Sequence, residues 1–218
     1  MGTITRSFAN NITTSGVLLP ASLTNNSIAN VTAYNASIAT GSMILLSSQT
    51  ASNSASISFT TGIDSTYKEY QFYFINCHPR TDNTFFGFNL STDSGSNYNV
   101  TKTSTLFQAY QDEAGSTSAL AYWTPGDLAQ GTGFQRLNSA SLGSGADESC
   151  VGIVQLFNPS STTYVKHFIV SSNGYDGSDY ILNTFVAGYG NTTSAINAVQ
   201  FKMESGNFDG DILMYGIV

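Results

Sequence analysis

The side chains that could move protons or bind a metal ion in this chain are few and scattered. His78 precedes Pro79 at the end of an apolar segment, and His167 lies in a second segment that is expected to be a strand. A general base or a metal site needs partner residues at defined spacing, and no motif links the two histidines. We therefore expect both histidines to be structural residues.

Paired carboxylates could support glycoside hydrolysis, and a few carboxylates together could bind calcium. The close groups are Asp112 with Glu113, Asp147 with Glu148, Asp176 with Asp179, and Asp209 with Asp211. All of them lie in stretches rich in Gly or Ser, which predict loops with solvated acidic residues. The last two groups could hold a calcium ion but lack the alternating oxygen ligands of an EF-hand loop. We expect no metal site and no cofactor.

The chain also lacks the short motifs that usually mark an active site. It contains no Gly-X-Ser-X-Gly, no phosphate loop ending in Gly-Lys, no Cys-X-X-Cys and no His-Glu-X-X-His. The pairs Gly131-Thr-Gly133 and Gly188-Tyr-Gly190 lack the third glycine of a dinucleotide site. We expect a protein that is not an enzyme, and a glycan-degrading enzyme is the alternative that two carboxylates would allow.

Aromatic side chains are the better candidates for ligand binding, because tyrosine and tryptophan rings can stack on sugar rings. Several of them fall in or next to stretches that are expected to be loops. The candidates are Tyr98, Tyr110, Tyr122, Trp123, Tyr175 and Tyr180. The alternative is that these rings lie in the core or in a subunit interface.

Charge and cysteine content restrict the partners. Seven basic against fourteen acidic residues give a net charge of −7, and the basic residues are spread singly, so we expect no binding to nucleic acid. No apolar run approaches the ~18 residues of a membrane span, and no secretory signal is evident, so we expect cytoplasmic synthesis without membrane insertion. Cys77 and Cys150 are expected to be buried free thiols, with a single disulfide as the alternative.

Residues 1–42 differ in composition from the rest of the chain. They are rich in Ser, Thr, Asn and Ala, and no charged residue occurs between Arg6 and Asp64. Their apolar residues come in small isolated groups, without the period of a strand or a helix. These residues are Val17, Leu18, Leu19, Ile28, Val31 and Ile38. We expect an extended N-terminal arm whose apolar residues occupy pockets on a neighbouring subunit, and a flexible leader is the alternative.

Residues 43–218 predict an all-β domain. Short segments of period two, rich in Val, Ile, Phe, Tyr and Thr, alternate with turns that contain Gly, Asn, Ser and Asp. Examples are residues 55–60, 85–90 and 198–203, each with apolar side chains on one face. A helix is conceivable only around residues 104–112. The pattern favours an antiparallel β-sandwich or jelly roll.

Two segments, residues 70–77 and 150–157, are apolar on nearly every residue, which predicts central strands covered on both faces. In the first, alternation places Phe72 and Phe74 on one face and Tyr73, Ile75 and Cys77 on the other. The opposing sheet would cover one face, and a sheet edge, a loop or another subunit would cover the second. Tyr73→Asp and Phe74→Asp should therefore differ, one dissociating an oligomer and the other unfolding the domain.

Several of these strand and turn segments resemble structural proteins encoded by phages of marine bacteria. They include YKEYQFYFINCHP at residues 67–79, FFGFNLSTDSG at 85–95, FNPSSTTYVKH at 157–167, NTTSAINAVQF at 191–201 and GDILMYGI at 210–217. The likeness covers residues 46–218 and carries no catalytic residues. It implies a component of the virion, assembled in the host cytoplasm.

The resemblance implies a capsid decoration, head fibre or tail fibre protein that contacts other virion proteins and is anchored by its N-terminal arm. For such proteins a homotrimer is the expected form. The alternative is a receptor-binding module that uses the aromatic candidates for host attachment through surface glycans. The sequence leaves open whether the protein belongs to the head or the tail.

Overall fold

The computed structural model describes residues 42–218, which form a single all-β sandwich. The predicted antiparallel β-sandwich is therefore confirmed for this part of the chain. The N-terminal arm, with its candidate contacts Val17, Leu18, Leu19, Ile28, Val31 and Ile38, lies outside the described residues. No helix in residues 42–218 is long and apolar enough to cross a membrane.

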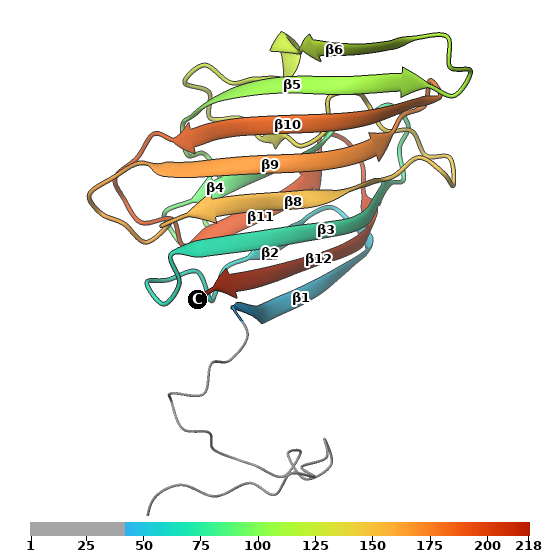
Figure 1. Ribbon diagram of the computed structural model, residues 1–218. Coiled ribbons are helices and arrows are strands. Elements are labelled where there is room, and N and C mark those ends of the chain that lie inside the picture. The colour runs from blue at the N-terminus through green and yellow to red at the C-terminus, as the bar shows by residue number, and fades with distance from the viewer. Residues whose placement is uncertain (1–41) are drawn as a thin grey trace, which may run out of the picture. The chain divides into compact units, whose positions relative to one another are not determined.

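The larger layer is an eight-stranded antiparallel sheet, which faces the viewer in Figure 1. In spatial order it consists of β1 (Met43–Ser54), β12 (Phe208–Ile217), β3 (Glu69–Pro79), β8 (Cys150–Phe157), β9 (Lys166–Tyr175), β10 (Tyr180–Gly190), β5 (Lys102–Asp112) and β6 (Ser118–Tyr122). The segments predicted to be central, β3 and β8, lie side by side in the middle of this sheet.

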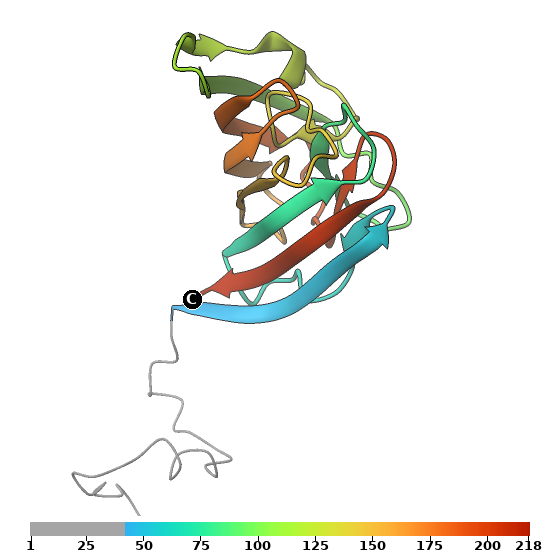
Figure 2. The same ribbon diagram turned by 90° about the vertical axis from the view of Figure 1, so that its right-hand side faces the viewer.

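The smaller layer has four strands and packs behind the larger sheet (Figures 1 and 2). Its order is β2 (Ile57–Phe59), β11 (Ala198–Met203), β4 (Phe86–Ser91) and β7 (Gln135–Arg136). The predicted alternation is confirmed in this sheet. Phe86, Phe88 and Phe201 are fully buried, whereas Gln200 and Lys202 point away from the core. A short 3-10 turn, η1 (Thr124–Gly126), follows β6.

Phenylalanine rings from both sheets form the core between them. The ring of Phe86 lies 5.5 Å from Phe74 and 5.4 Å from Phe208, both on the larger sheet. Phe88 meets Phe168 edge-on at 5.2 Å. Each such ring contributes roughly 1.5–3 kcal/mol by leaving water, so this layer supplies the main stabilisation that holds the two sheets together.

Two local predictions are wrong. Residues 104–112 form a strand, part of β5, because they pair along their length with β10 and also with β6. Cys77 shares the buried face with Phe74, not the opposite face, because a bulge between these residues shifts the alternation by one position. Asn76 adopts a φ of 49° in the bulge, a left-handed conformation that asparagine tolerates.

Candidate interaction surface

The face of the eight-stranded sheet that points away from the core is the most unusual surface of the described chain. We call it the outer face and define it by the outward side chains of the eight strands. Its apolar members are Met43, Leu45, Leu213, Tyr215, Ile217, Tyr73, Ile75, Val151, Ile153, Phe157, Ile169, Tyr175, Ile181, Phe185, Ala187, Tyr189, Phe107, Ala109, Leu120 and Tyr122.

Exposed apolar side chains are concentrated on this face. In residues 42–218, eleven large apolar side chains are exposed, and nine of them point out of the outer face. The other two are Tyr164 in a loop and the C-terminal Val218. The water-facing side of an antiparallel sheet normally carries polar residues. This sheet instead carries many apolar residues on both sides, although only one side packs against the core.

The outside of the four-stranded sheet provides an internal contrast. Gln200 on β11 donates a hydrogen bond to Ser58 Oγ on β2 at 2.9 Å, and Lys202 lies over the ring of Phe134 at 4.7 Å. Polar side chains therefore cover this surface as they do on ordinary exposed sheets. The apolar character of the outer face is a property of one side of the molecule only.

Charge is sparse on the outer face. Its ionisable side chains, apart from tyrosines, are Glu69, His78, His167, Asp209 and Asp211, and no Lys or Arg points outward from these eight strands. Glu69 accepts hydrogen bonds from the side-chain amides of Gln71 and Gln155. The resulting surface is poor in charge and rich in aromatic residues, which is the composition of the buried centre of a protein interface.

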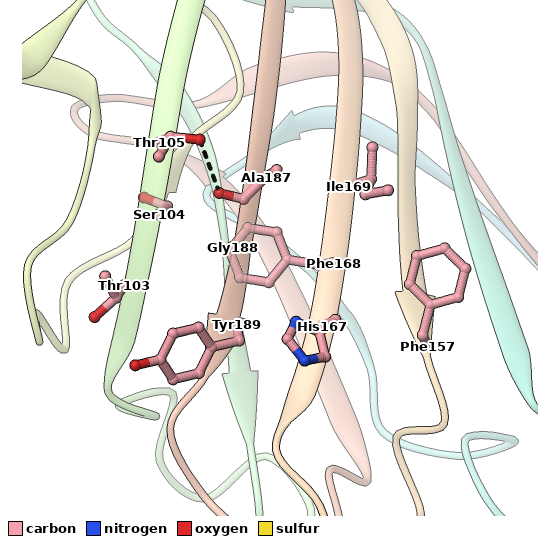
Figure 3. Close-up of a pocket in the computed structure, with 10 residues that line it drawn as sticks. All are labelled: Thr103, Ser104, Thr105, Phe157, His167, Phe168, Ile169, Ala187, Gly188 and Tyr189. Atoms are coloured by element: carbon pink, nitrogen blue, oxygen red, sulfur yellow. Dashed lines mark hydrogen bonds between the residues drawn. The ribbon is translucent and has the colours of Figure 1, made fainter.

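A hollow in the outer face lies across β5, β10, β9 and the end of β8 (Figure 3). The rings of Phe157, His167 and Tyr189 line it, with the last two 6.0 Å apart. Gly188 lies at its base, where a Cβ atom would lie 2.6 Å from the ring of Phe168, a residue of the core side. The base of the hollow is therefore formed by backbone, with the ring of Phe168 on the core side beneath it.

A second hollow lies nearer the middle of the sheet, over β3, β8 and β9. Tyr73, Val151 and Ile153 line it together with small polar residues of β9. Its base is at Gly152, where a Cβ would lie 2.5 Å from the ring of Phe74. Aromatic side chains, such as Phe107 stacked on Phe185 at 5.1 Å, project from the same face beside these hollows.

The six aromatic candidates for ligand binding do not form one site. Tyr110 and Tyr180 lie 5.7 Å apart near the ends of β5 and β10. Tyr122 belongs to the outer face through its pairing with Phe107. Tyr175 also lies on the outer face, at the end of β9. The remaining two are separate: Trp123 packs on Phe85 and against the core, and Tyr98 lies in the loop after β4. Tyr110, Tyr122, Tyr175 and Tyr180 lie in strands, so the expectation of loop aromatics does not hold for Tyr110 and Tyr175.

Several of the acidic residues and one of the histidines are held by hydrogen bonds or an ion pair to residues distant in the sequence. Asp209 lies in β12, not in the predicted loop, and forms an ion pair with Arg80 at 2.7 Å, and Asp211 of the same strand accepts a hydrogen bond from Thr50. Hydrogen bonding to the arginine lowers the pKa of Asp209. His78 contacts the carbonyl oxygen of Gly145 at 2.8 Å. Within residues 42–218, no three His, Cys, Asp or Glu side chains gather as a metal site.

Two buried lysines were not anticipated from the sequence. Lys102 and Lys166 flank Gly190 on neighbouring strands and point to the core side. Lys102 Nζ donates to Asn89 Oδ1 at 2.5 Å and to the carbonyl oxygen of Val100 at 2.7 Å. Burial lowers the pKa of Lys102 to about 7. Burial of Lys102 could have been inferred only from its inward position in the alternation of β5, and the sequence did not predict that strand.

Comparison with known proteins finds no match to the chain among family models, curated proteins or solved structures. The fold and the outer face define this protein as an all-β sandwich with one largely apolar sheet surface.

Proposed function

We propose that the chain is a non-enzymatic structural protein of a bacteriophage particle, as a head decoration, head fibre or tail fibre component. The observation that carries the structural part of this proposal is the outer face, which is largely apolar, poor in charge and as broad as the molecule's larger sheet. A surface of this kind serves an assembly, because in a lone chain it would remain in contact with water.

The assignment to a phage particle is supported by the resemblance of residues 46–218 to structural proteins of marine phages. The same segments form the framework of the fold: residues 67–79 contain β3, residues 85–95 contain β4, and residues 210–217 form most of β12. A virion location and attachment through residues 1–42 follow from this resemblance and from the composition of that segment.

The direct test is to look for the protein in purified particles. Mass spectrometry should detect it at a fixed ratio to the major capsid protein, and immunogold electron microscopy should place it at the head surface or along a fibre. Deletion of residues 1–42 should leave a folded domain that no longer joins the particle. Particles that lack the protein would contradict the virion proposal, and normal incorporation of the truncated chain would contradict the role of the arm.

Glycan binding is a second candidate, favoured by one observation, the aromatic lining of the hollow in Figure 3. Phe157 and Tyr189 could stack on a sugar ring while His167 supplies a hydrogen-bonding group. A glycan array probed with the full chain should then show binding that Tyr189→Ala removes. No binding at millimolar glycan, with and without calcium, would exclude this function.

A further inference from the structure

We propose that the outer face is the contact surface between copies of this chain, so that a second copy covers its apolar side chains. This inference goes beyond membership of a phage particle, since it concerns the isolated protein. Three observations support it: the area of the face, the type of side chains on it, and the fact that a second copy is available as soon as the chain is made.

The size of the face matches a stable interface. Eight strands at a spacing of about 4.8 Å span roughly 34 Å, and strands of about ten residues at 3.3 Å each run roughly 33 Å. The footprint is therefore roughly 1,000 Å² on each copy, or about 2,000 Å² in total. Stable protein interfaces bury about 1,200–2,000 Å² in total, so the outer face alone provides enough area.

The side chains favour a protein surface as the occupant. Branched aliphatic residues occupy part of the middle of the face, where Ile153 and Ile169 lie on the adjacent strands β8 and β9, and Ile169 is 46% exposed. A sugar is bound by flat aromatic rings with several convergent hydrogen-bonding groups, whereas branched aliphatic chains pack best against other apolar side chains. Nucleic acid is excluded as the occupant because no Lys or Arg lies on this face.

Among protein partners, another copy of the chain best fits the observations. The outer face must be covered as soon as the domain folds, because so large an apolar surface promotes aggregation. A second copy is present whenever the chain is made, whereas a partner from the particle is met only during assembly. The carboxylates Glu69, Asp209 and Asp211 lie on the half of the sheet formed by β1, β12 and β3, and no carboxylate points outward from the half formed by β10, β5 and β6.

This asymmetry suggests how copies pack. If the acidic half of one copy contacts the uncharged half of the next, no two carboxylates face each other. Both a two-fold pair and the trimer expected from the sequence allow that arrangement. In either case Ile169, near the boundary between the halves, lies in the centre of the contact, where substitutions have the largest effect on association.

The test is the mass of the full-length protein in solution, measured by light scattering during size exclusion. Wild type should have two or three times the mass of the 23.2 kDa chain. Ile169→Asp should be monomeric with an unchanged circular dichroism spectrum. Tyr164→Asp, which places the same charge at a 70% exposed tyrosine away from the outer face, should keep the parental mass. A monomeric wild type at tens of micromolar, or an Ile169→Asp protein of parental mass, would overturn the proposal.

A second measurement avoids placing a charged side chain in the proposed contact. Ile169→Cys and Tyr164→Cys place a thiol at each position, and the native Cys77 and Cys150 are buried. Both new positions are well exposed in the single chain, so similar maleimide reaction rates would mean that the outer face is free in solution. We expect at least tenfold slower labelling at position 169. Loss of the protein from particles would affect the virion proposal and leave both results unchanged.

Discussion

Tyr73 and Phe74 are neighbours in β3 whose side chains point to opposite faces of the eight-stranded sheet. Phe74 is fully buried and its ring lies 5.5 Å from Phe86 of the smaller sheet. Tyr73 points out of the outer face, where its ring meets Tyr215 edge-on at 5.5 Å and its hydroxyl donates a hydrogen bond to Gln71 Oε1 at 3.2 Å. The two positions thus separate folding from association within one dipeptide.

Phe74→Asp should unfold the domain, because it deletes a buried ring and places an unpaired charge in the core, at a cost of more than about 4 kcal/mol. Tyr73→Asp should fold and lose association, since its charge lies in the proposed contact between copies. Circular dichroism and light scattering on the two variants check this. Two folded variants of parental mass would show that neither residue has its assigned role.

Gly188 provides a prediction about packing beneath the hollow of Figure 3. A Cβ at this position would lie 2.6 Å from Phe168 Cζ and 2.6 Å from the backbone oxygen of Thr103, which cannot move aside easily. Gly188→Ala should therefore reduce the free energy of unfolding by about 1–3 kcal/mol. Gly133→Ala is the matched control, because no atom lies within 4 Å of its Cβ position. Equal midpoints in urea for the two variants would contradict the packing argument.

The sequence predicted the sandwich because most strands carry apolar residues at every second position on the core side. Ala198–Met203 and Cys150–Phe157 were predicted with the bounds that the structure has. β5 was missed because its inward positions include Lys102, Ser104 and Gln108, whereas Phe107 points outward. Several polar side chains of β5 therefore point inward while an aromatic one points outward, the reverse of the usual strand pattern. Only pairing with β10 and β6 defines this segment as a strand.

The outer face could be predicted only in part. The two-sided apolar character of β3 and β8 indicated a second covered surface, but its extent depends on the order of eight strands, which local patterns do not encode. The grouping of the aromatic residues was unpredictable for the same reason. Tyr110 and Tyr180 are 70 positions apart in the chain and become neighbours through the register of β5 and β10.

The cysteines should be unreactive in the folded protein and free once it unfolds. Cys77 and Cys150 are cross-strand neighbours, and both are buried. Burial raises the pKa of each thiol, so the reactive thiolate is scarce. We expect no reaction with Ellman's reagent under native conditions and two equivalents per chain in guanidinium. No reaction in denaturant before reduction would show a disulfide, contrary to the prediction of free thiols.

The last prediction concerns pH. Burial lowers the pKa of Lys102 to about 7, whereas an unfolded lysine titrates near 10.4. Between these values the unfolded chain binds a proton that the folded chain does not, so stability should rise with pH above 7, by up to about 1.4 kcal/mol per unit. Below pH 7 both states are protonated and the effect is constant.

The window for this measurement is pH 7 to 8.5, because ionisation of the unfolded cysteines, with a pKa near 8.5, opposes the trend increasingly at higher pH. Relative to Lys102→Met, wild type should gain about 1.6 kcal/mol across the window in guanidinium unfolding at fixed protein concentration, because Lys102 is half-titrated at pH 7. Lys102→Met should lose this gain, while Lys202→Met, which alters a lysine outside the core, should keep it. If Lys102→Met and wild type show parallel pH profiles, Lys102 is charged in the folded protein, and its hydrogen bonds to Asn89 and Val100 then hold an ammonium ion.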